Sequence, residues 1–538
     1  GSEISEIWAA GSRMLLCAAG SFAAAAAVGF LAARLAASFS QRIRSLLFSK
    51  VDSFSMEEIS RFSTASLITR STNDITQVQM LITTGIQLLF KAPIMVIWAL
   101  IKIRGKGIEW TAATGAAAGI MIAVIVLLII FVMPKFQKMQ QLTDDLNRVT
   151  RENLTGLRVV RAYNAERYQE EKFEDINRRL TDTQLYTNRG MAIMMPMMTT
   201  LMSGLSLVIY WIGAYLINRA EAASRLTLFS DMVVFSSYAV QIIMSFMTLA
   251  MIFILLPRAS VSAKRINEVL ETEPAIIDGT QKDGREGMEG QVEFRDVSFK
   301  YPGASEYVLK NISFIAKKGE TVALIGSTGS GKSTLLNLIP RFYDVGSGEV
   351  LVDGINVKEY TQESLHNKIG YVPQKAVMFR GTVKSNVELG DNGRKKPESE
   401  EIAAAVRIAQ GGDFVERMEK QYEADIAQGG TNLSGGQKQR LAIARAVCRK
   451  PELYLFDDSF SALDYRTDRN LRTALKKETA DVTSLIVAQR VGTIRDADRI
   501  IVLDEGETVG IGTHKELLEN CRVYREIAMS QLSEEELA

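Results

Sequence analysis

The sequence predicts a multidomain chain in which an all-α transmembrane helix bundle is followed by a soluble α/β domain. Long apolar stretches recur up to about Pro257, and stretches of this length are typical of helices that cross a bilayer. After Glu273, short β-rich runs alternate with helical stretches, which is typical of a mainly parallel sheet covered by helices. We expect a transmembrane domain with cytoplasmic helical extensions over residues 1–265, a linker over 266–290, and a soluble domain over 291–538 with a helical subdomain near 376–440.

Five stretches are long and apolar enough to be membrane spans, where an even number is expected. A bilayer core of about 30 Å needs roughly 20 apolar helical residues. The expected spans are Trp8–Ala36, Gln77–Ile103, Ile108–Met133, Gly190–Ile217 and Leu228–Leu256. Pro134 and Pro257 directly follow two of them, and we expect each proline to end its helix. If the soluble domain is cytosolic, five spans leave the N-terminus outside, so we expect that a first span is missing from this sequence.

The charges between the spans favour this topology. The cytoplasmic segments would then be long and basic, as the positive-inside rule requires. The segment between the first and second spans carries Arg42, Arg44, Arg61 and Arg70, and the segment between the third and fourth carries Arg151, Arg158 and Arg161. One short loop placed outside opposes the assignment because it carries Lys102, Arg104 and Lys106. Because the segments placed inside carry more positive charge than this loop, we expect a multi-pass cell-membrane protein with a cytoplasmic soluble domain.

Two charged residues and a group of methionines within the spans are candidates for roles other than lipid contact. Lys91 lies deep in the second span, where an ionisable group either marks an interior site or snorkels toward the interface. Asp231 is expected to cap the N-terminus of the last helix. The fourth span opens with methionines, which suit a pliable substrate cavity or simply fill apolar space. They are Met191, Met194, Met195, Met197, Met198 and Met202.

Overall composition excludes several classes of function. The chain has 63 basic and 62 acidic residues, a net charge of +1, so no polybasic surface for nucleic acid is indicated. Cys17, Cys448 and Cys521 are too few and too widely spaced for a disulfide framework or a metal site.

The soluble part contains seven β-rich runs separated by helical stretches, and a glycine-rich loop follows the second. The runs are Val292–Tyr301, Thr321–Gly326, Val350–Val357, Ile369–Pro373, Leu453–Asp457, Ser484–Ala488 and Arg499–Leu503. The loop reads Gly326, Ser327, Thr328, Gly329, Ser330, Gly331, Lys332, Ser333, Thr334. A G-x4-G-K-S sequence between a strand and a helix is a P-loop, whose backbone amides cradle phosphates. We expect Lys332 to neutralise the β and γ charges of ATP and the Ser333 hydroxyl to bind Mg²⁺.

Two further motifs complete a predicted nucleotide site. Asp457 ends a fully apolar strand and is the expected carboxylate partner of Mg²⁺. Leu433–Gln437 exposes backbone at the start of a second helix, with Ser434, Gly435, Gly436 and Gln437 as an anion-binding turn. Because the P-loop already holds the phosphates of its own nucleotide, the second turn makes sense if it closes over a nucleotide held by another chain.

These residues resemble the ATP-binding cassette (ABC) transporters of exporter type. The resemblance rests on the P-loop, the Leu433–Gln437 signature and the Asp457 strand in the family's order. It implies that Tyr301 stacks on adenine, that Gln374 is the glutamine contacting Mg²⁺ and water, and that Asp464 belongs to the loop facing the partner cassette. It also implies two cassettes enclosing two MgATP, ATP hydrolysis coupled to transport, and coupling helices near Ser63–Asp74 and Thr155–Glu166.

The sequence departs from the family pattern at three positions. Asp458 stands where the family has the glutamate that activates water, so its carboxylate is one methylene shorter. Gln489 stands where the family has the switch histidine, and an amide carries no charge at neutral pH. Gln428 replaces a glutamate before the signature.

We therefore predict a degenerate-site subunit of a heterodimeric multidrug or lipid exporter. Asp458, Gln489 and Gln374 would form a slow catalytic site, while the intact signature would complete the active site of a different partner half. The transported compounds would be amphipathic drugs, lipids or peptides taken from the bilayer or cytosol. The alternatives are a homodimeric exporter with two sluggish sites, and an ATP-gated channel or regulatory membrane protein. An importer is disfavoured because importers usually carry spans and cassette on separate chains.

Overall fold

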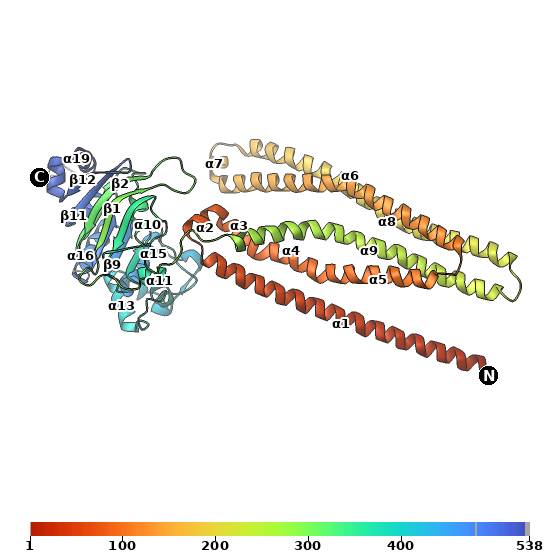
Figure 1. The fold of residues 1–538 in the computed structure, drawn as a ribbon. Coiled ribbons are helices and arrows are strands. Elements are labelled where there is room, and N and C mark those ends of the chain that lie inside the picture. The colour runs from red at the N-terminus through yellow and green to blue at the C-terminus, as the bar shows by residue number, and fades with distance from the viewer. Residues whose placement is uncertain (1, 479–480, 533–538) are drawn as a thin grey trace. The chain divides into compact units, whose positions relative to one another are not determined.

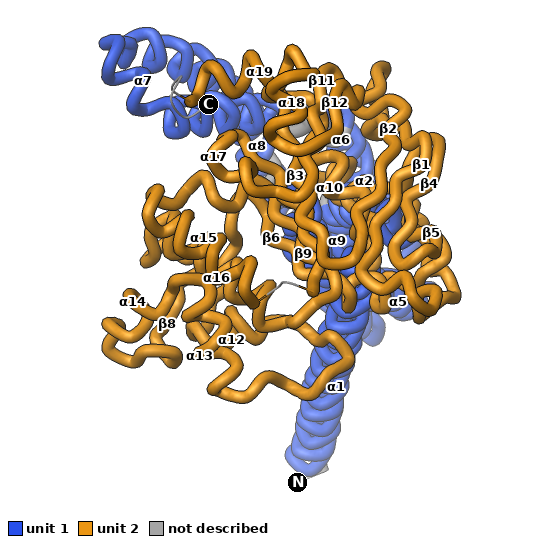
Figure 2. Tube along the Cα trace, turned by 90° about the vertical axis from the view of Figure 1, so that its left-hand side faces the viewer, with its two compact units in different colours: residues 1–52, 65–272 blue, residues 53–64, 273–538 orange. Residues whose placement is uncertain are grey.

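The computed structural model describes residues 2–478 and 481–532, which form two compact units (Figure 2). The first unit comprises residues 1–52 and 65–272, and the second comprises residues 53–64 and 273–538. A short N-terminal segment therefore belongs with the C-terminal cassette.

The first unit is all-α and is dominated by long helices (Figure 1). Its α-helices are α1 (Ser2–Asp52), α3 (Thr64–Thr69), α4 (Ile75–Met80), α5 (Ile86–Ile103), α6 (Ile108–Thr155), α7 (Leu157–Ala162), α8 (Glu166–Arg219) and α9 (Arg225–Glu271). Two π-helical turns, Arg70–Asp74 and Leu81–Gly85, join α3, α4 and α5 into one continuous rod. Among the described residues, five helices are long and apolar enough to cross a membrane, as expected.

Two proline predictions are wrong. Pro134 lies inside α6 and Pro257 lies inside α9, and both helices continue well beyond them. A proline removes only one backbone donor, and membrane helices tolerate this loss where neighbouring helices compensate. Because α9 runs to Glu271, the beginning of the expected linker is helical.

The prediction for Asp231 is also wrong. Helix α9 begins at Arg225, with Ser224 at its N-cap, so Asp231 lies within the helix. Its carboxylate forms an ion pair with Lys106 instead. This pair neutralises one of the two basic residues in the loop between α5 and α6, Arg104 and Lys106, whereas Lys102 lies in the last turn of α5.

Helices α6 and α8 lie side by side and are joined by the short α7 (Figure 1). Their apolar core with α9 centres on Trp110, Ile209 and Phe235, each fully buried. The Trp110 indole donates to the Ile209 carbonyl at 3.1 Å. Of the methionine run, Met198 is buried in this core, whereas Met195 and Met197 are exposed. The Met194 side chain lies outside the described side chains. Lys91 is exposed on α5.

The second unit contains three sheets covered by helices (Figure 2). A four-stranded sheet has the order β2-β1-β4-β5, and a six-stranded sheet has the order β12-β11-β3-β10-β9-β6. The strands of the first are β1 (Val292–Phe299), β2 (Leu309–Ala316), β4 (Ser347–Val352) and β5 (Ile355–Asn356). Those of the second are β3 (Thr321–Gly326), β6 (Ile369–Val372), β9 (Leu453–Asp457), β10 (Thr483–Val487), β11 (Arg499–Asp504) and β12 (Glu507–Gly512). The pair β7 (Gly381–Thr382) and β8 (Asp425–Ile426) lies apart from both.

In the six-stranded sheet β6, β9, β10, β3 and β11 pair in parallel, and only the edge strand β12 is antiparallel. β9 and β10 are buried along their whole length, which explains why both read as continuous apolar runs. All seven predicted runs are strands or contain strands. Because parallel strands end at one edge, the loops after β3, β6, β9 and β10 meet there.

The helices of this unit fall into three groups. The P-loop helix and its neighbour are α10 (Lys332–Leu338) and α11 (Gln362–Asn367). The central region contains α12 (Val383–Val387), α13 (Ser399–Ile408), α14 (Gly412–Val415), α15 (Gly435–Cys448) and α16 (Tyr465–Glu478). The C-terminal group is α17 (Val491–Ile494), α18 (His514–Asn520) and α19 (Arg522–Met529).

The N-terminal segment of the second unit is helix α2 (Met56–Phe62). Ser55 and Glu58 form a capping box around its first turn. Glu58 is 4% exposed and also accepts a hydrogen bond from the Ala275 amide at 3.0 Å. The first expected coupling segment, Ser63–Asp74, directly follows α2: residues 63–64 group with the cassette and residues 65–74 with the helical unit.

Candidate nucleotide-binding site

The P-loop leaves β3 and turns sharply into α10. Gly331 has φ of 93° and precedes the first residue of the helix. A Cβ at this position would lie 2.6 Å from Leu309 Cδ2 and 3.0 Å from the Val308 carbonyl. The glycine is therefore required both for its left-handed conformation and for the close approach of β2.

Lys332 is folded back onto the P-loop. Its Nζ donates to the carbonyls of Gly326 at 2.9 Å and Ser327 at 2.7 Å, and to Ser330 Oγ at 3.2 Å. Burial lowers the pKa of Lys332, although the nearby carboxylates of Asp457 and Asp458 oppose the shift. An ammonium held in this way has given up water, and among the described residues no carboxylate lies close enough to form an ion pair with it. Phosphate oxygens placed in the loop would supply that missing negative charge.

Ser333 and Asp457 place two oxygen ligands side by side. The Ser333 hydroxyl donates to Asp457 Oδ1 at 2.6 Å. Burial raises the pKa of Asp457, and the neighbouring Asp458 raises it further. A carboxylate, a hydroxyl and the phosphates of a nucleotide form the oxygen set that Mg²⁺ prefers. These residues fit that ion, and a divalent cation would relieve the cost of the buried carboxylate.

Asp458 is the meeting point of three loops at the same sheet edge. Its Oδ2 accepts from Gln489 Nε2 at 2.8 Å and from Gln374 Nε2 at 3.2 Å. Its backbone has φ of 46°, and its amide donates to the Val487 carbonyl at 3.0 Å. Burial raises the pKa of Asp458. The sequence predicted these three side chains as one catalytic group, and the structure brings them together.

Tyr301 lies beside the P-loop helix within an aromatic cluster. Its hydroxyl lies 2.9 Å from Thr334 Oγ1, with either atom as donor. Its ring meets Phe299 and Tyr343 edge-on, with centroids 5.0 and 5.3 Å apart. These contacts hold the ring near the phosphate cradle, where a base could stack on it.

The signature turn is built as a helix N-terminus. Ser434 is the N-cap of α15: its hydroxyl accepts from the Gln437 amide at 3.3 Å, while Gln437 Oε1 accepts from the Ser434 amide at 2.9 Å. A Cβ on Gly435 would meet nothing within 4 Å, so the space before the turn is open. A Cβ on Gly436 would lie 3.4 Å from the Ala462 carbonyl, which places the turn against the loop that leads to Asp464.

Asp464 lies directly before α16, and the signature turn begins α15. Asp464 Oδ2 accepts from the Thr467 amide at 3.0 Å, at the start of α16. Among the residues that the structure describes, no hydrogen bond joins the signature turn or Asp464 to the P-loop of the same chain. The remaining P-loop candidates, Ser327, Thr328, Gly329 and Ser330, lie in the turn between β3 and α10.

Two site residues escaped the sequence reasoning. Gln439, in α15, is 3% exposed and donates to the Pro373 carbonyl at 3.2 Å, so the signature helix contacts the segment that carries Gln374. Glu58 ties α2 to the cassette, and its Ser-x-x-Glu spacing was a readable capping-box signal. Gln439 gave no signal because a polar residue one turn inside a helix is usually exposed.

Comparison with known proteins agrees with this geometry. The model of the ABC transporter transmembrane region matches residues 11–272, and the ABC transporter model matches residues 309–461. An uncharacterized ABC transporter ATP-binding protein of Mycobacterium tuberculosis is 40% identical over 91% of this chain and 83% of its own length. Another, from Bacillus subtilis, is 36% identical over 99% of this chain and 91% of its own length.

Two named relatives extend the comparison. An ATP-dependent lipid A-core flippase of Pseudomonas fluorescens is 34% identical over 84% of this chain and 74% of its own length. The ATP-bound structure of a bacterial Atm1-family ABC exporter matches with a TM-score of 0.77 and 26% identity, covering 93% of this chain and 87% of the other. The chain belongs to the ABC transporter family. It has the exporter architecture, in which membrane helices and a cytoplasmic ATPase domain share one polypeptide and ATP hydrolysis is coupled to transport.

Proposed function

We propose that this chain is the degenerate-site half of a heterodimeric exporter. It holds MgATP between its P-loop and the partner's signature turn and hydrolyses that nucleotide slowly. Its own turn at Ser434–Gln437 completes the fast site of a different partner half. The observation that carries the proposal is the geometry around Asp458.

The Asp458 carboxylate is poorly placed to activate water. It is one methylene shorter than glutamate, and the bonds from Gln489 and Gln374 to its Oδ2 fix the carboxylate at this shorter reach. The left-handed backbone conformation of Asp458 and the hydrogen bond from its backbone amide to the Val487 carbonyl hold the residue in place. A general base must come within hydrogen-bond reach of the attacking water, and a displacement of about 1 Å can cost about 100-fold in rate. The raised pKa of Asp458 strengthens it as a base but does not move it closer.

Gln489 cannot replace a histidine electrostatically. Its amide donates a hydrogen bond but neither carries a proton nor charges at neutral pH. By contrast, the signature turn keeps a complete capping box and open space before Gly435. The chain thus lacks the usual glutamate and histidine beside its own P-loop but keeps an intact signature turn. This combination supports an asymmetric pair of sites.

A groove on the membrane unit supports amphipathic cargo. It lies between α6 and α8 and has a volume of about 770 Å³. Leu127, Phe131, Ile193 and Met197 line its apolar part, and Asp182 and Arg189 line its polar part. An apolar wall with a few charged groups suits a molecule with a hydrocarbon body and a polar head. The flippase relatives act on a compound of that kind, as their name states.

The asymmetry is tested by comparing two substitutions in the complex purified with its partner. Asp458→Asn should leave ATPase activity within about two-fold of the parent, because the fast site lies elsewhere. Ser434→Ala should lower it by about ten-fold or more, because a helix-cap oxygen facing the partner's nucleotide is lost. Mass spectrometry of the co-purified chain identifies the partner.

Three results would change the conclusion. Robust, cooperative hydrolysis by this chain alone would refute the asymmetric model, and equal losses from both substitutions would indicate a homodimer with two sluggish sites. ATP binding without hydrolysis-dependent flux in vesicles would indicate a gated channel.

A further inference from the structure

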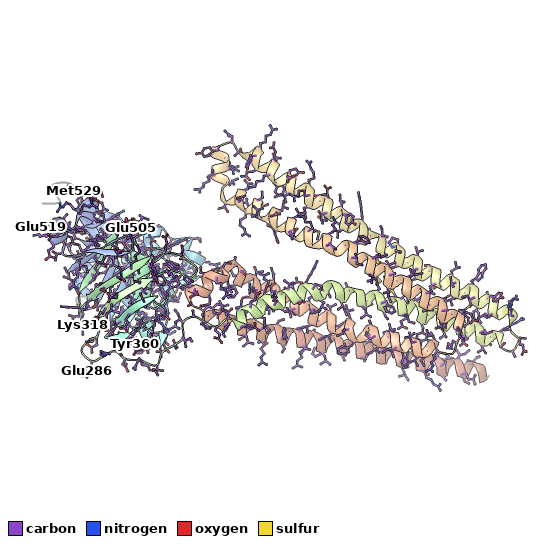
Figure 3. The ribbon with its side chains drawn as sticks, turned by 45° about the horizontal axis from the view of Figure 1, so that its top comes forward. Glu286, Lys318, Tyr360, Glu505, Glu519 and Met529 are labelled. Carbon is purple, nitrogen blue, oxygen red and sulfur yellow. The ribbon has the colours of Figure 1, made fainter. Side chains whose placement is uncertain are left out.

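The C-terminal segment contacts the turn that carries Gln489. Helix α19 ends at Met529, which Figure 3 labels beside Glu519 on the cassette. Two residues later, Gln531 Nε2 donates to the Gln489 carbonyl at 2.8 Å, and Gln531 Oε1 accepts from the Val491 amide at 2.8 Å. One side chain therefore binds the backbone on both sides of Arg490.

These two backbone groups need an external partner. Val491 is the first residue of α17, and amides in the first turn of a helix have no intrahelical acceptor. The N-cap residue of α17 is Arg490, whose side chain makes no capping bond. Gln531 therefore caps α17 from a position 40 residues later in the chain. Parallel pairing of β10 ends at Val487, just before this turn.

The segment that carries Gln531 is anchored in the cassette core. Tyr524 and Ala528 of α19 are fully buried, as is Val491 at the start of α17. All three belong to one apolar cluster, and Leu532 packs against it. The amide of Gln531 also donates to the Ala528 carbonyl at 3.0 Å. Gln531 thus contacts the turn from a fixed base.

We propose that Gln531 is a positioning residue for ATP hydrolysis, which holds the Gln489–Val491 turn so that the Gln489 amide reaches Asp458. The connected bonds run from Gln531 to the Gln489 carbonyl, and from Gln489 Nε2 to Asp458 Oδ2 at 2.8 Å. Displacement of the turn breaks the second bond and changes how the Asp458 carboxylate is held. This inference rests on the proposed role of Asp458 and Gln489. The C-terminal segment would then tune the turnover of the site without touching nucleotide.

The test compares the assembled transporter in lipid nanodiscs with three variants. Gln531→Ala removes both bonds. Gln531→Glu keeps the acceptor for Val491 and loses the donor to Gln489 at neutral pH. Ser530→Ala is the matched control, because that hydroxyl donates to Ile527 within α19. Hydrogen–deuterium exchange over residues 487–495, kcat and KM for ATP, and the melting temperature are measured. If the partner site dominates, that site is silenced in every sample.

For Gln531→Ala we expect exchange in the turn to rise about five-fold or more, the factor given by one lost hydrogen bond of ordinary strength. The kcat should fall about five- to ten-fold, while KM, melting temperature and the Ser530→Ala control stay near the parent values. For Gln531→Glu, activity relative to the parent should recover as pH falls, because a protonated carboxyl regains the donor.

Faster exchange in Gln531→Ala with an unchanged kcat would overturn the positioning role. Unchanged exchange in the turn would do the same, as would an activity of Gln531→Glu, relative to the parent, that does not vary with pH. If Gln531→Ala fails to assemble, the pH profile of Gln531→Glu decides. Every rate is a ratio to the parent, so a fast parent site would refute the proposed asymmetry without affecting this result.

Discussion

If the site of this chain is the slow one, as we propose, glutamate at 458 and histidine at 489 should convert it into a fast one. The perturbation is Asp458→Glu combined with Gln489→His. Glutamate extends the carboxylate by one methylene, and histidine in place of Gln489 supplies a side chain that can carry a proton and a charge near neutral pH. Recovering about 1 Å of reach is worth about 100-fold in rate, so we expect the double variant to gain between about 30- and 100-fold. Asp458→Glu alone should gain less, because the Gln489 amide still carries no charge.

The assay is single-turnover hydrolysis of labelled ATP with the partner's site silenced, so that only the site of this chain is seen. MgATP affinity, measured separately, should remain within about three-fold because the P-loop is untouched. If the double variant hydrolyses no faster than the parent while binding MgATP equally well, the placement of Asp458 does not limit the rate and the degenerate-site reasoning fails.

Three further outcomes follow from the cassette geometry. Gly331→Ala should lower cassette stability by about 2 kcal/mol and weaken MgATP binding, because the left-handed φ of 93° is strained for alanine; calorimetry measures both, and a neutral result would contradict the clash at Leu309. Glu58→Gln should cost about 1–3 kcal/mol, because the amide keeps only one acceptor oxygen and leaves the bond from either the Ser55 or the Ala275 amide unmade. Burial opposes ionisation of Glu58, but its hydrogen bonds lower its pKa. Its contribution to stability is therefore present above the unfolded pKa of about 4.3 and lost as pH falls through the lower folded value. Burial lowers the pKa of His514. Cassette stability should therefore decrease as pH falls from about 7 through the unfolded pKa of about 6.5. If the melting temperature of His514→Gln changes with pH as steeply as that of the parent, another group is responsible.

Much of the cassette could be read from sequence because its signals are local. A P-loop needs glycines at fixed spacing, and strands buried on both faces read as apolar runs, as β9 and β10 do. β2 and β12 escaped notice because exposed and half-buried positions interrupt their apolar residues.

The errors arose where tertiary contacts override local preference. The sequence predicted helix ends at Pro134 and Pro257, but both prolines lie inside long helices, which membrane proteins tolerate. Asp231 read as a cap because its ion partner, Lys106, lies 125 residues away in the chain. The bonds of Gln531 to the Gln489 turn join segments about 40 residues apart, and nothing in the local sequence indicates such a pairing.

Vesicle transport by Lys332→Ala tests the central claim of the proposal most directly, namely that transport of amphipathic compounds across the bilayer requires MgATP held on this P-loop. Lys318→Ala, at an exposed lysine of the same cassette (Figure 3), is the control. We expect Lys332→Ala to lose MgATP binding at this site and to lower ATP-dependent flux by about ten-fold or more, with Lys318→Ala unchanged. Flux equal to the parent in Lys332→Ala would contradict the account.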